Sequence, residues 1–380
     1  MIFMENSSVN KLFLFVLFTV VTFVYTVISH NFDVHIEYGM LFISFFISLS
    51  LFCINSKYLP YYIFLSVYFY VFSDNHTAMS PIDANKFYTE AFIESFYGDD
   101  HFSTVVATGY MYRLFSYFVN DNSPQILVSL NFIVHGLCVL FLLKCGRLFN
   151  RDYFSEKAFA FFGFMSPLLL SQMPYLIKDY FSVFFSILAF YYLIQYRIHN
   201  KYIYIVLAFF ALITSMLFRV YSPIYTIMLI VITGNYSKYY IYGIVILLCS
   251  FFAVFGQNVI MYLAYSILAI YFIPNFLEVN NYLNLPFSTA ESLLFFMVNA
   301  YVVYYLLMHM KKREIKIYIT MISLIAITFA FTSIYRVTYS VSYDSSNGGG
   351  YLADNFFRKK LPIMYIFIFY FFNFRRLVRN

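Results

Sequence analysis

Apolar runs recur along the whole of this 380-residue chain, each about as long as a helix needs to be to cross a membrane. Hydrophobic residues make up 62% of the sequence and charged residues 11%, whereas soluble globular proteins carry about 25% charged residues. Lipid offers no partner for backbone polar groups, which favours helices. We therefore predict an all-α, polytopic integral membrane protein, a single-domain helical bundle over residues 1–380 with about 11–13 transmembrane helices.

The apolar runs define the expected spans. They lie at 11–29, 38–54, 58–73, 126–143, 158–175, 180–196, 202–218, 220–235, 239–256, 291–309, 317–334 and 361–374, and 257–274 is a further candidate. The first run is too long for a removable signal peptide and lacks a small-residue cleavage site, so we expect it to remain as a span.

Lysine and arginine in the short loops predict the orientation, because positive residues near span ends are retained in the cytoplasm. The basic loops contain Lys144, Arg147, Arg151 and Lys157, then Arg197 and Lys201, then Lys311, Lys312, Arg313 and Lys316, and the tail contains Arg375, Arg376 and Arg379. This bias predicts cytoplasmic termini and two larger outer loops, 74–125 and 335–360. The net charge of +6 reflects the same bias, so it indicates lipid headgroups and no nucleic acid as the partner.

The outer loop 74–125 is too long for a simple connection and is expected to carry helices. Ser80, Pro81 and Asp83 have the pattern of an N-cap, a first-turn proline and a capping-box acid, so we predict an amphipathic helix that ends before Gly98. Tyr88 falls on its apolar face. Asp83 can serve as a helix cap, as a functional carboxylate, or as both.

A second helix is predicted over Thr104–Val119, in which Val106, Tyr110, Arg113 and Tyr117 share one stripe. An arginine in such an apolar helix either extends to the headgroups or meets an anionic ligand. Asp99, Asp100 and His101 follow Gly98, and we interpret them as a solvated turn rather than a metal site.

Charged residues at outer span ends form the most informative group in the sequence. Lys178 and Asp179 lie between two apolar runs, where they could simply neutralise each other. Arg219 is expected outside, against the positive-inside trend, and an outer arginine within a bundle needs an anion such as a phosphate. Arg336 extends this outer basic set.

These features together resemble the bacterial oligosaccharide repeat-unit polymerases of the Wzy or EpsG-like type, which are multi-spanning glycosyltransferases broadly similar to the GT-C class. The resemblance covers most of the chain and rests on short motifs: Asp83 with Tyr88, Gly109-Tyr110, Ser166-Pro167 ahead of Lys178-Asp179, and Arg219. Similar proteins often have arginine at the position of Lys178.

The resemblance implies an enzyme of the bacterial inner membrane that joins undecaprenyl-diphosphate-linked oligosaccharides at the periplasmic face into O-antigen, capsule or exopolysaccharide. It implies no soluble nucleotide-sugar donor, and it allows a chain-length regulator as a partner. We expect no cofactor, and no metal because the sequence has no metal-ligand spacing. We expect Asp83 and Arg219 to be catalytic. The expected diphosphate- and sugar-binding residues are Lys178, Arg113, Arg336, Tyr88, Tyr110, Tyr221 and Asp179, of which Asp179 is the less favoured base because Lys178 can neutralise it.

Two alternatives remain. A polyprenyl-phosphate-sugar-dependent glycosyltransferase would add single sugars, and it would usually place paired acids in its first outer loop, where this chain has Asp33 and Glu37. A lipid-linked oligosaccharide flippase or other transporter would show internal repeats and charges that line mid-membrane helices. We see no clear repeat, and the charges lie at span ends.

Overall fold

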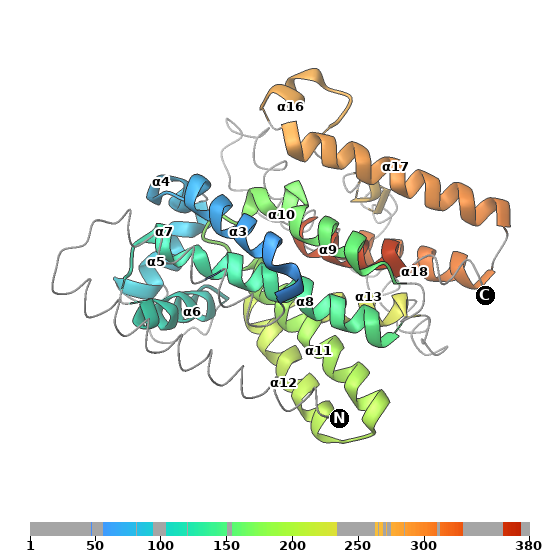
Figure 1. Ribbon diagram of the computed structural model, residues 1–380, viewed down its shortest axis with the longest axis horizontal. Helices are drawn as coiled ribbons and strands as arrows, with labels where there is room; N and C mark the ends of the chain where they lie inside the picture. Colours follow the sequence, from blue (N-terminus) through green and yellow to red (C-terminus); the bar gives the residue numbers. More distant parts are fainter. Residues whose placement is uncertain are drawn as a thin grey trace. The chain divides into compact units, whose positions relative to one another are not determined.

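A computed structural model of the protein describes residue 47 and residues 56–80, 82–93, 104–119, 121–149, 154–233, 263–264, 266–268, 271, 275–284, 286–309, 312–329 and 360–373. Throughout these ranges the chain is helical with short turns and contains no strand (Figure 1). The prediction of an all-α fold is confirmed for this part of the chain. The predicted spans at 11–29 and 239–256, and nearly all of 38–54, lie outside the described residues.

The helices follow one another along the chain, and several begin at a proline. In chain order they are the 3₁₀ turn η1 (Ser56–Tyr58), α3 (Leu59–Phe72), α4 (Asn75–Met79), α5 (Ile82–Phe92), α6 (Thr104–Val119), α7 (Pro124–Leu127), α8 (Ser129–Phe149), α9 (Glu156–Met165), α10 (Pro167–Gln172), α11 (Asp179–His199), α12 (Ile203–Phe218), α13 (Pro223–Ile232), α16 (Val279–Asn284), α17 (Pro286–His309) and α18 (Lys312–Phe329). Residues 360–373 form a further helix. Proline begins α7, α10, α13 and α17, because the first helical position needs no N–H donor.

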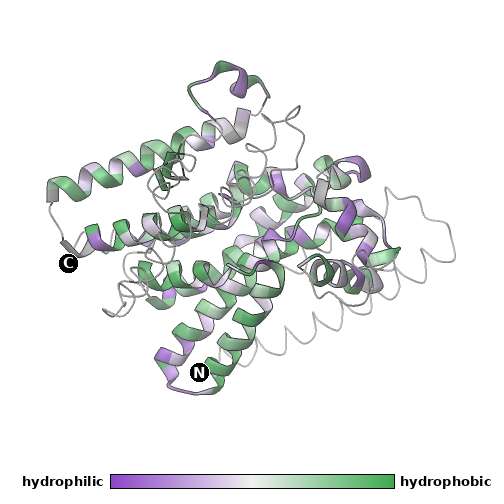
Figure 2. Ribbon diagram, turned by 180° about the vertical axis from the view of Figure 1, so that it is seen from behind, coloured by the Kyte–Doolittle hydropathy of each residue, from purple (hydrophilic) through white to green (hydrophobic). Residues whose placement is uncertain are grey.

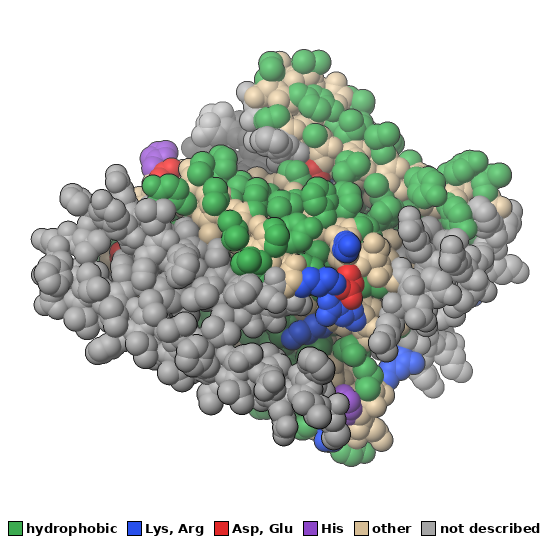
Figure 3. All heavy atoms as spheres, viewed as in Figure 1, with side chains coloured by type: hydrophobic (Ala, Val, Ile, Leu, Met, Phe, Trp, Pro, Cys, Tyr) green, Lys and Arg blue, Asp and Glu red, His purple; other side chains and the backbone are tan. Residues whose placement is uncertain are grey.

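Three of the described helices are long and apolar enough to cross a membrane. They are Pro124–Phe149, which joins α7 and α8, then α11, and Thr289–Met308 within α17. Shorter apolar helices are α3, α12, α13, Ile315–Thr328 and Lys360–Asn373. The exposed side of α3 is covered by hydrophobic side chains (Figure 3). Figure 2 shows that α12 and α17 consist largely of hydrophobic residues, and many of these are exposed.

The expected span 158–175 is not one continuous helix. It consists of α9 and α10, which are separated at Ser166, and residues 173–178 are not helical at all. Ser166 has φ −59° and ψ 116°, since the ring of Pro167 disfavours helical dihedral angles in the residue before it. Hydropathy does not register such a break, because the residues on both sides of it are apolar.

The structure also adds α4 to the predicted outer loop. Asp74 caps this short helix by accepting hydrogen bonds from the backbone N–H and the hydroxyl of Thr77, at 2.6 and 2.7 Å. Ser80, which we predicted as the cap of the following helix, instead closes α4, since its hydroxyl donates to the Thr77 carbonyl at 3.0 Å. The predicted helix is present as α5 from Ile82, and residues 94–103 beyond it lie outside the described part of the chain.

The chain divides into two compact units. The first contains residues 1–140, 173–184 and 217–219. Within it α5 packs against α6, and the contact requires a glycine on α6: a Cβ atom at Gly109 would lie 2.9 Å from Glu90 Cγ and 3.2 Å from the Ala91 backbone nitrogen. One face of α6, the predicted second helix of the loop, is buried in this unit. Its buried residues include Val105, Thr108 and Tyr112.

The second unit contains residues 141–172, 185–216 and 220–380. Its core is rich in phenylalanine: the rings of Phe154, Phe159 and Phe190 all contact the ring of Phe369. The start of α9 is tied to the end of α8, where Arg147 donates to both oxygens of Glu156 at 2.5 and 2.8 Å.

Candidate functional site

The first unit contains a buried stretch of irregular backbone, the segment 173–178, between α10 and α11. Met173, Leu176 and Ile177 of this segment are completely buried. Buried backbone outside a helix leaves N–H and C=O groups that must find other partners. Those partners therefore determine how the segment is fixed.

Side chains from two helices bind the carbonyl groups of this segment. Asn131 of α8 donates through its amide nitrogen to the carbonyls of Met173 and Tyr175, at 3.3 and 2.7 Å. The hydroxyl of Tyr112 on α6 donates to the Ile177 carbonyl at 3.1 Å. The backbone itself adds a bond from the Leu176 N–H to the Ala78 carbonyl at the end of α4, at 3.1 Å.

The segment ends at Lys178, whose buried side chain lies close to residues of α5 and α6. Its Nζ atom donates to the hydroxyl of Thr104 at 2.5 Å and lies 5.7 Å from the centre of the Phe87 ring. A cation over an aromatic face gains electrostatic attraction, which grows when the pair is removed from water. Thr104 and Phe87 therefore fix the ammonium group in place.

Asp179 begins α11, and its carboxylate binds the guanidinium of Arg219. Arg219 Nε donates to Oδ1 at 2.9 Å, and Nη2 donates to Oδ2 at 3.0 Å. The Asp179 side chain is 1% exposed and the Arg219 side chain 15%. A carboxylate in the first turn of a helix is also stabilised by the helix dipole, so the position suits a buried negative charge.

This geometry corrects one interpretation drawn from the sequence. We considered Lys178 as the counter-ion of Asp179 because the two are adjacent, but the structure assigns that role to Arg219, which follows 40 residues later. Arg219, at the end of α12, binds the carboxylate through two hydrogen bonds, the arrangement that guanidinium and carboxylate favour. Both oxygens of the Asp179 carboxylate therefore accept hydrogen bonds from Arg219.

The structure also describes four other predicted binding residues. Arg113 and Tyr110 both have exposed side chains on α6. Tyr88 is half-buried on α5 with its ring against Phe92, and Tyr221, in the second unit, has its ring against Tyr225. For Arg113 the exposure fits the interpretation of a side chain that extends outward.

Two predicted residues cannot be placed by their side chains. Asp83 lies in the first turn of α5, but its side chain is outside the described residues, and Arg336 falls outside them entirely. Their predicted roles therefore stay predictions.

Sequence reasoning missed the residues that hold the cluster together. Thr104, Tyr112 and Asn131 are neutral and lie in apolar helices, where they resemble ordinary span residues. A buried asparagine in such a helix is a weak signal in itself, because an unsatisfied amide would be unfavourable there and so requires polar partners. Without the structure, those partners are not visible.

In chemical terms the cluster contains two cations and one carboxylate: Lys178, Arg219 and Asp179 sum to a net charge of +1. A net positive charge favours an anion rather than a cation as a ligand. Among the described residues no group of three or more His, Cys, Asp or Glu side chains is placed to hold a metal ion. Comparisons of the chain with protein-family models, with curated proteins and with solved structures find no match.

Proposed function

We propose that this protein is a polytopic glycosyltransferase of the bacterial inner membrane that polymerises undecaprenyl-diphosphate-linked oligosaccharide repeat units at the periplasmic face. Its termini are cytoplasmic in this proposal, and its product is a surface polysaccharide. The apolar composition and the three helices long enough to cross a membrane support a membrane location. The Wzy-like motifs in the sequence support the reaction.

One observation carries the proposal: Asp179 holds the Arg219 guanidinium in a fixed orientation, and Lys178 adds a second fixed cation, an ammonium, at the same helix start. Removal of a lipid diphosphate is the step that most needs positive charge, because negative charge develops on the leaving oxygen. Preorganised cations stabilise that charge without having to reorganise during the reaction.

The proposed reaction needs one further group. The acceptor hydroxyl oxygen bonds to the anomeric carbon of the donor glycan, the bond from that carbon to the diphosphate oxygen breaks, and the diphosphate departs with the electron pair. A carboxylate takes the hydroxyl proton, and we assign this role to Asp83, because Asp179 is bound by Arg219. Tyr88, Tyr110 and Tyr221 are proposed to contact sugar faces, and Arg113 and Arg336 to support diphosphate binding.

Deletion of the gene tests the class of function. The proposal predicts cells whose surface glycan ends after one repeat unit, with export of that unit intact. Loss of export would indicate a lipid-linked oligosaccharide flippase, and loss of a single sugar from each unit would indicate a polyprenyl-phosphate-sugar-dependent transferase.

Arg219→Lys tests the site itself. Lysine keeps the positive charge beside Asp179 but lacks the planar fork, so the protein should stay folded while chain extension falls by about tenfold or more. Arg147→Lys is the matched control, because Arg147 makes a similar two-point pair with Glu156 in the other unit. Equal chain lengths in both variants, at equal abundance in the membrane, would remove Arg219 from the mechanism.

A further inference from the structure

The amide of Asn131, on α8, is completely buried and binds the irregular backbone between α10 and α11. Its Nδ2 atom donates to the carbonyls of Met173 and Tyr175, at 3.3 and 2.7 Å. Its Oδ1 atom lies 3.3 Å from the hydroxyl oxygen of Tyr112. That hydroxyl also lies 3.1 Å from the Ile177 carbonyl oxygen, so its single proton is shared between two acceptors. Asn131 and Tyr112 therefore bind three carbonyls of the segment as one connected pair.

The polar groups of this backbone explain why an asparagine suits the position. The groups that Asn131 binds there are carbonyl acceptors, and a neutral amide offers two N–H donors together with one acceptor. An ionised aspartate would present acceptors alone. A leucine of similar size would remove the donors that the two carbonyls use, and a buried carbonyl that loses its donor is unfavourable.

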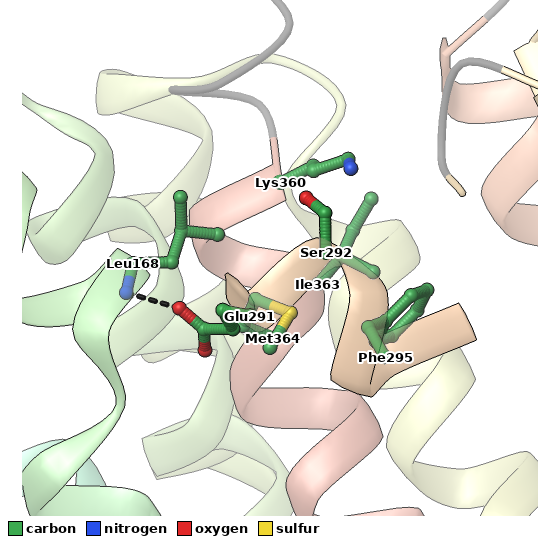
Figure 4. A pocket seen from close by; sticks show the side chains of 7 residues that line it. All are labelled: Leu168, Glu291, Ser292, Phe295, Lys360, Ile363 and Met364. Atoms are coloured by element: carbon green, nitrogen blue, oxygen red, sulfur yellow. Dashed lines mark hydrogen bonds between the residues drawn. The ribbon is translucent and has the colours of Figure 1, made fainter. Parts of the chain in front are cut away.

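A break elsewhere in the chain shows the opposite pairing. Between α9 and α10, in the second unit, Glu291 of α17 accepts a hydrogen bond from the Ser166 hydroxyl at 2.5 Å and another from the Leu168 backbone N–H. Figure 4 shows the Glu291 carboxylate turned toward Leu168. The backbone group at that break is a donor and its partner is an acceptor, whereas Asn131 supplies donors to backbone acceptors. Each side chain thus matches the polar groups that it meets.

Tyr112 binds the peptide group that leads directly into Lys178. The Ile177 carbonyl and the Lys178 nitrogen belong to one planar peptide unit, so a hydrogen bond to that carbonyl restrains the backbone of Lys178. The other end of Lys178 is bound by the same helix, because its Nζ atom donates to Thr104 of α6 at 2.5 Å. Helix α6 therefore restrains Lys178 at its backbone and at its ammonium, and Asn131 binds the tyrosine hydroxyl that makes the first of these contacts.

All the residues of this network belong to the first unit. We infer that Asn131 is a positioning residue for the proposed diphosphate site: through Tyr112 and the segment 173–178 it sets the position of the Lys178 ammonium. The inference rests on the proposed function, in which that ammonium stabilises the charge of the departing diphosphate. Asn131 contacts no reacting atom in this reaction, so its effect passes through Lys178.

Binding of farnesyl diphosphate to the purified full chain in nanodiscs tests this role. The affinity is measured at a temperature at which every variant is folded, so that a loss of stability does not register as a loss of binding. Asn131→Leu keeps the size of the side chain and removes its donors. It should weaken binding of the probe by about tenfold, since small displacements of a positioned group have large effects. Chain extension in cells, at equal abundance in the membrane, should fall similarly.

A double-mutant cycle with Lys178 separates positioning from general support of the fold. Lys178→Met removes the ammonium from a side chain of similar length and should itself weaken probe binding by about tenfold or more. In that background Asn131→Leu should weaken binding by less than about twofold further, because the group that it positions is gone. Equal effects of Asn131→Leu in the two backgrounds would show that Asn131 supports the fold without positioning the cation, and the inference would be wrong.

Asn299 provides the matched control in the second unit. It is a buried asparagine in the apolar helix α17, and its Oδ1 atom also lies 3.3 Å from a tyrosine hydroxyl, that of Tyr318. Its Nδ2 atom, however, donates to the carbonyl of Phe295 in its own helix, at 2.8 Å. Asn299→Leu should therefore leave probe binding unchanged, and a loss equal to that of Asn131→Leu would contradict the inference.

Tyr112→Phe carries the test if Asn131→Leu does not accumulate in the membrane. This variant keeps the buried ring and removes the hydroxyl that joins Asn131 to the Ile177 carbonyl. It should weaken probe binding by about threefold to tenfold, the value of one hydrogen bond, and only when Lys178 is present. Normal probe binding in the variant tested would overturn the inference, while a defect in Arg219→Lys would still support the proposed function. If the unmodified protein does not bind farnesyl diphosphate and Arg219→Lys extends chains normally, the proposed function fails, and the inference fails with it.

Discussion

Arg219 and Asp179 form a two-point ion pair that joins the end of α12 to the start of α11, with the carboxylate almost completely removed from solvent. Breaking a buried pair by removing one partner leaves an uncompensated charge and costs about 3–5 kcal/mol, whereas exposed pairs contribute about 0–1 kcal/mol. The burial of this pair, rather than its charge alone, therefore determines how much its loss would destabilise the protein.

We predict that Asp179→Ala and Arg219→Ala each lower the stability of the purified protein by about 3 kcal/mol, because each leaves its partner buried without its counter-ion. The double variant should be less destabilised than the sum of the two single variants. Thermal unfolding in nanodiscs, followed by aromatic fluorescence, measures all four proteins. Additive losses would show that the two side chains act independently.

The pair of Arg147 and Glu156 provides the comparison, since its side chains are 37% and 27% exposed. Arg147→Ala and Glu156→Ala should each cost at most about 1 kcal/mol, because solvent screens the charge that remains. The contrast between the two pairs isolates burial as the cause.

Tyr112→Phe is predicted to loosen the segment 173–178. The change removes the hydroxyl that donates to the Ile177 carbonyl and keeps the buried ring, so the loss should be about 1–2 kcal/mol. Hydrogen exchange should rise at the Leu176 amide, which bonds to Ala78 in the same region. Unchanged exchange there, despite the lost hydroxyl, would mean that Asn131 alone fixes the segment.

Gly109→Ala should separate α5 from α6. Its new methyl group would lie 3.2 Å from the backbone nitrogen of Ala91, which cannot move aside as a flexible side chain can. We expect a loss of about 1–3 kcal/mol, the usual effect of overpacking. Tyr117→Ala, at a position of α6 that is 71% exposed, is the control and should change the melting temperature little.

The cap of α4 should respond to acid. Hydrogen bonds from the backbone N–H and the hydroxyl of Thr77 lower the pKa of Asp74 below its usual value of 3.8. A carboxyl with a lower pKa in the folded state contributes stability above its unfolded pKa and loses it as the pH falls through the folded value. Exchange protection at Thr77, corrected for intrinsic rates, should therefore decline below about pH 4, and Asp74→Asn should remove that pH dependence.

The helical class and several helix positions could be predicted from the sequence because they follow from apolar runs and proline positions. The prediction for Thr104–Val119 matches α6 at both ends, and that for 202–218 differs from α12 by one residue at its start. The break at Ser166 was missed because span length was judged from hydropathy, although Pro167 itself indicated a helix start. A proline rule applied within the apolar runs would have found it.

The candidate site was only partly accessible from the sequence. Its charged members were found because lysine, aspartate and arginine are rare in apolar stretches. Their pairing could not be predicted from the sequence, since Asp179 and Arg219 are brought together by the turn between α11 and α12 rather than by any local pattern. Glu291 was overlooked because it lies at the start of an apolar run, where an acid also resembles a favourable first-turn residue.

The distance along the chain between Asp179 and Arg219 also affects the order of events during synthesis. With 40 residues between the partners and a synthesis rate of about 5–20 residues per second, the carboxylate waits for its guanidinium for about 2–8 seconds. The partners of the carbonyls of the segment 173–178 are synthesised before the segment itself, because Tyr112 and Asn131 precede it in the chain. The nascent chain thus acquires the backbone scaffold of the cluster first, and its charge balance only when the α11–α12 hairpin is complete.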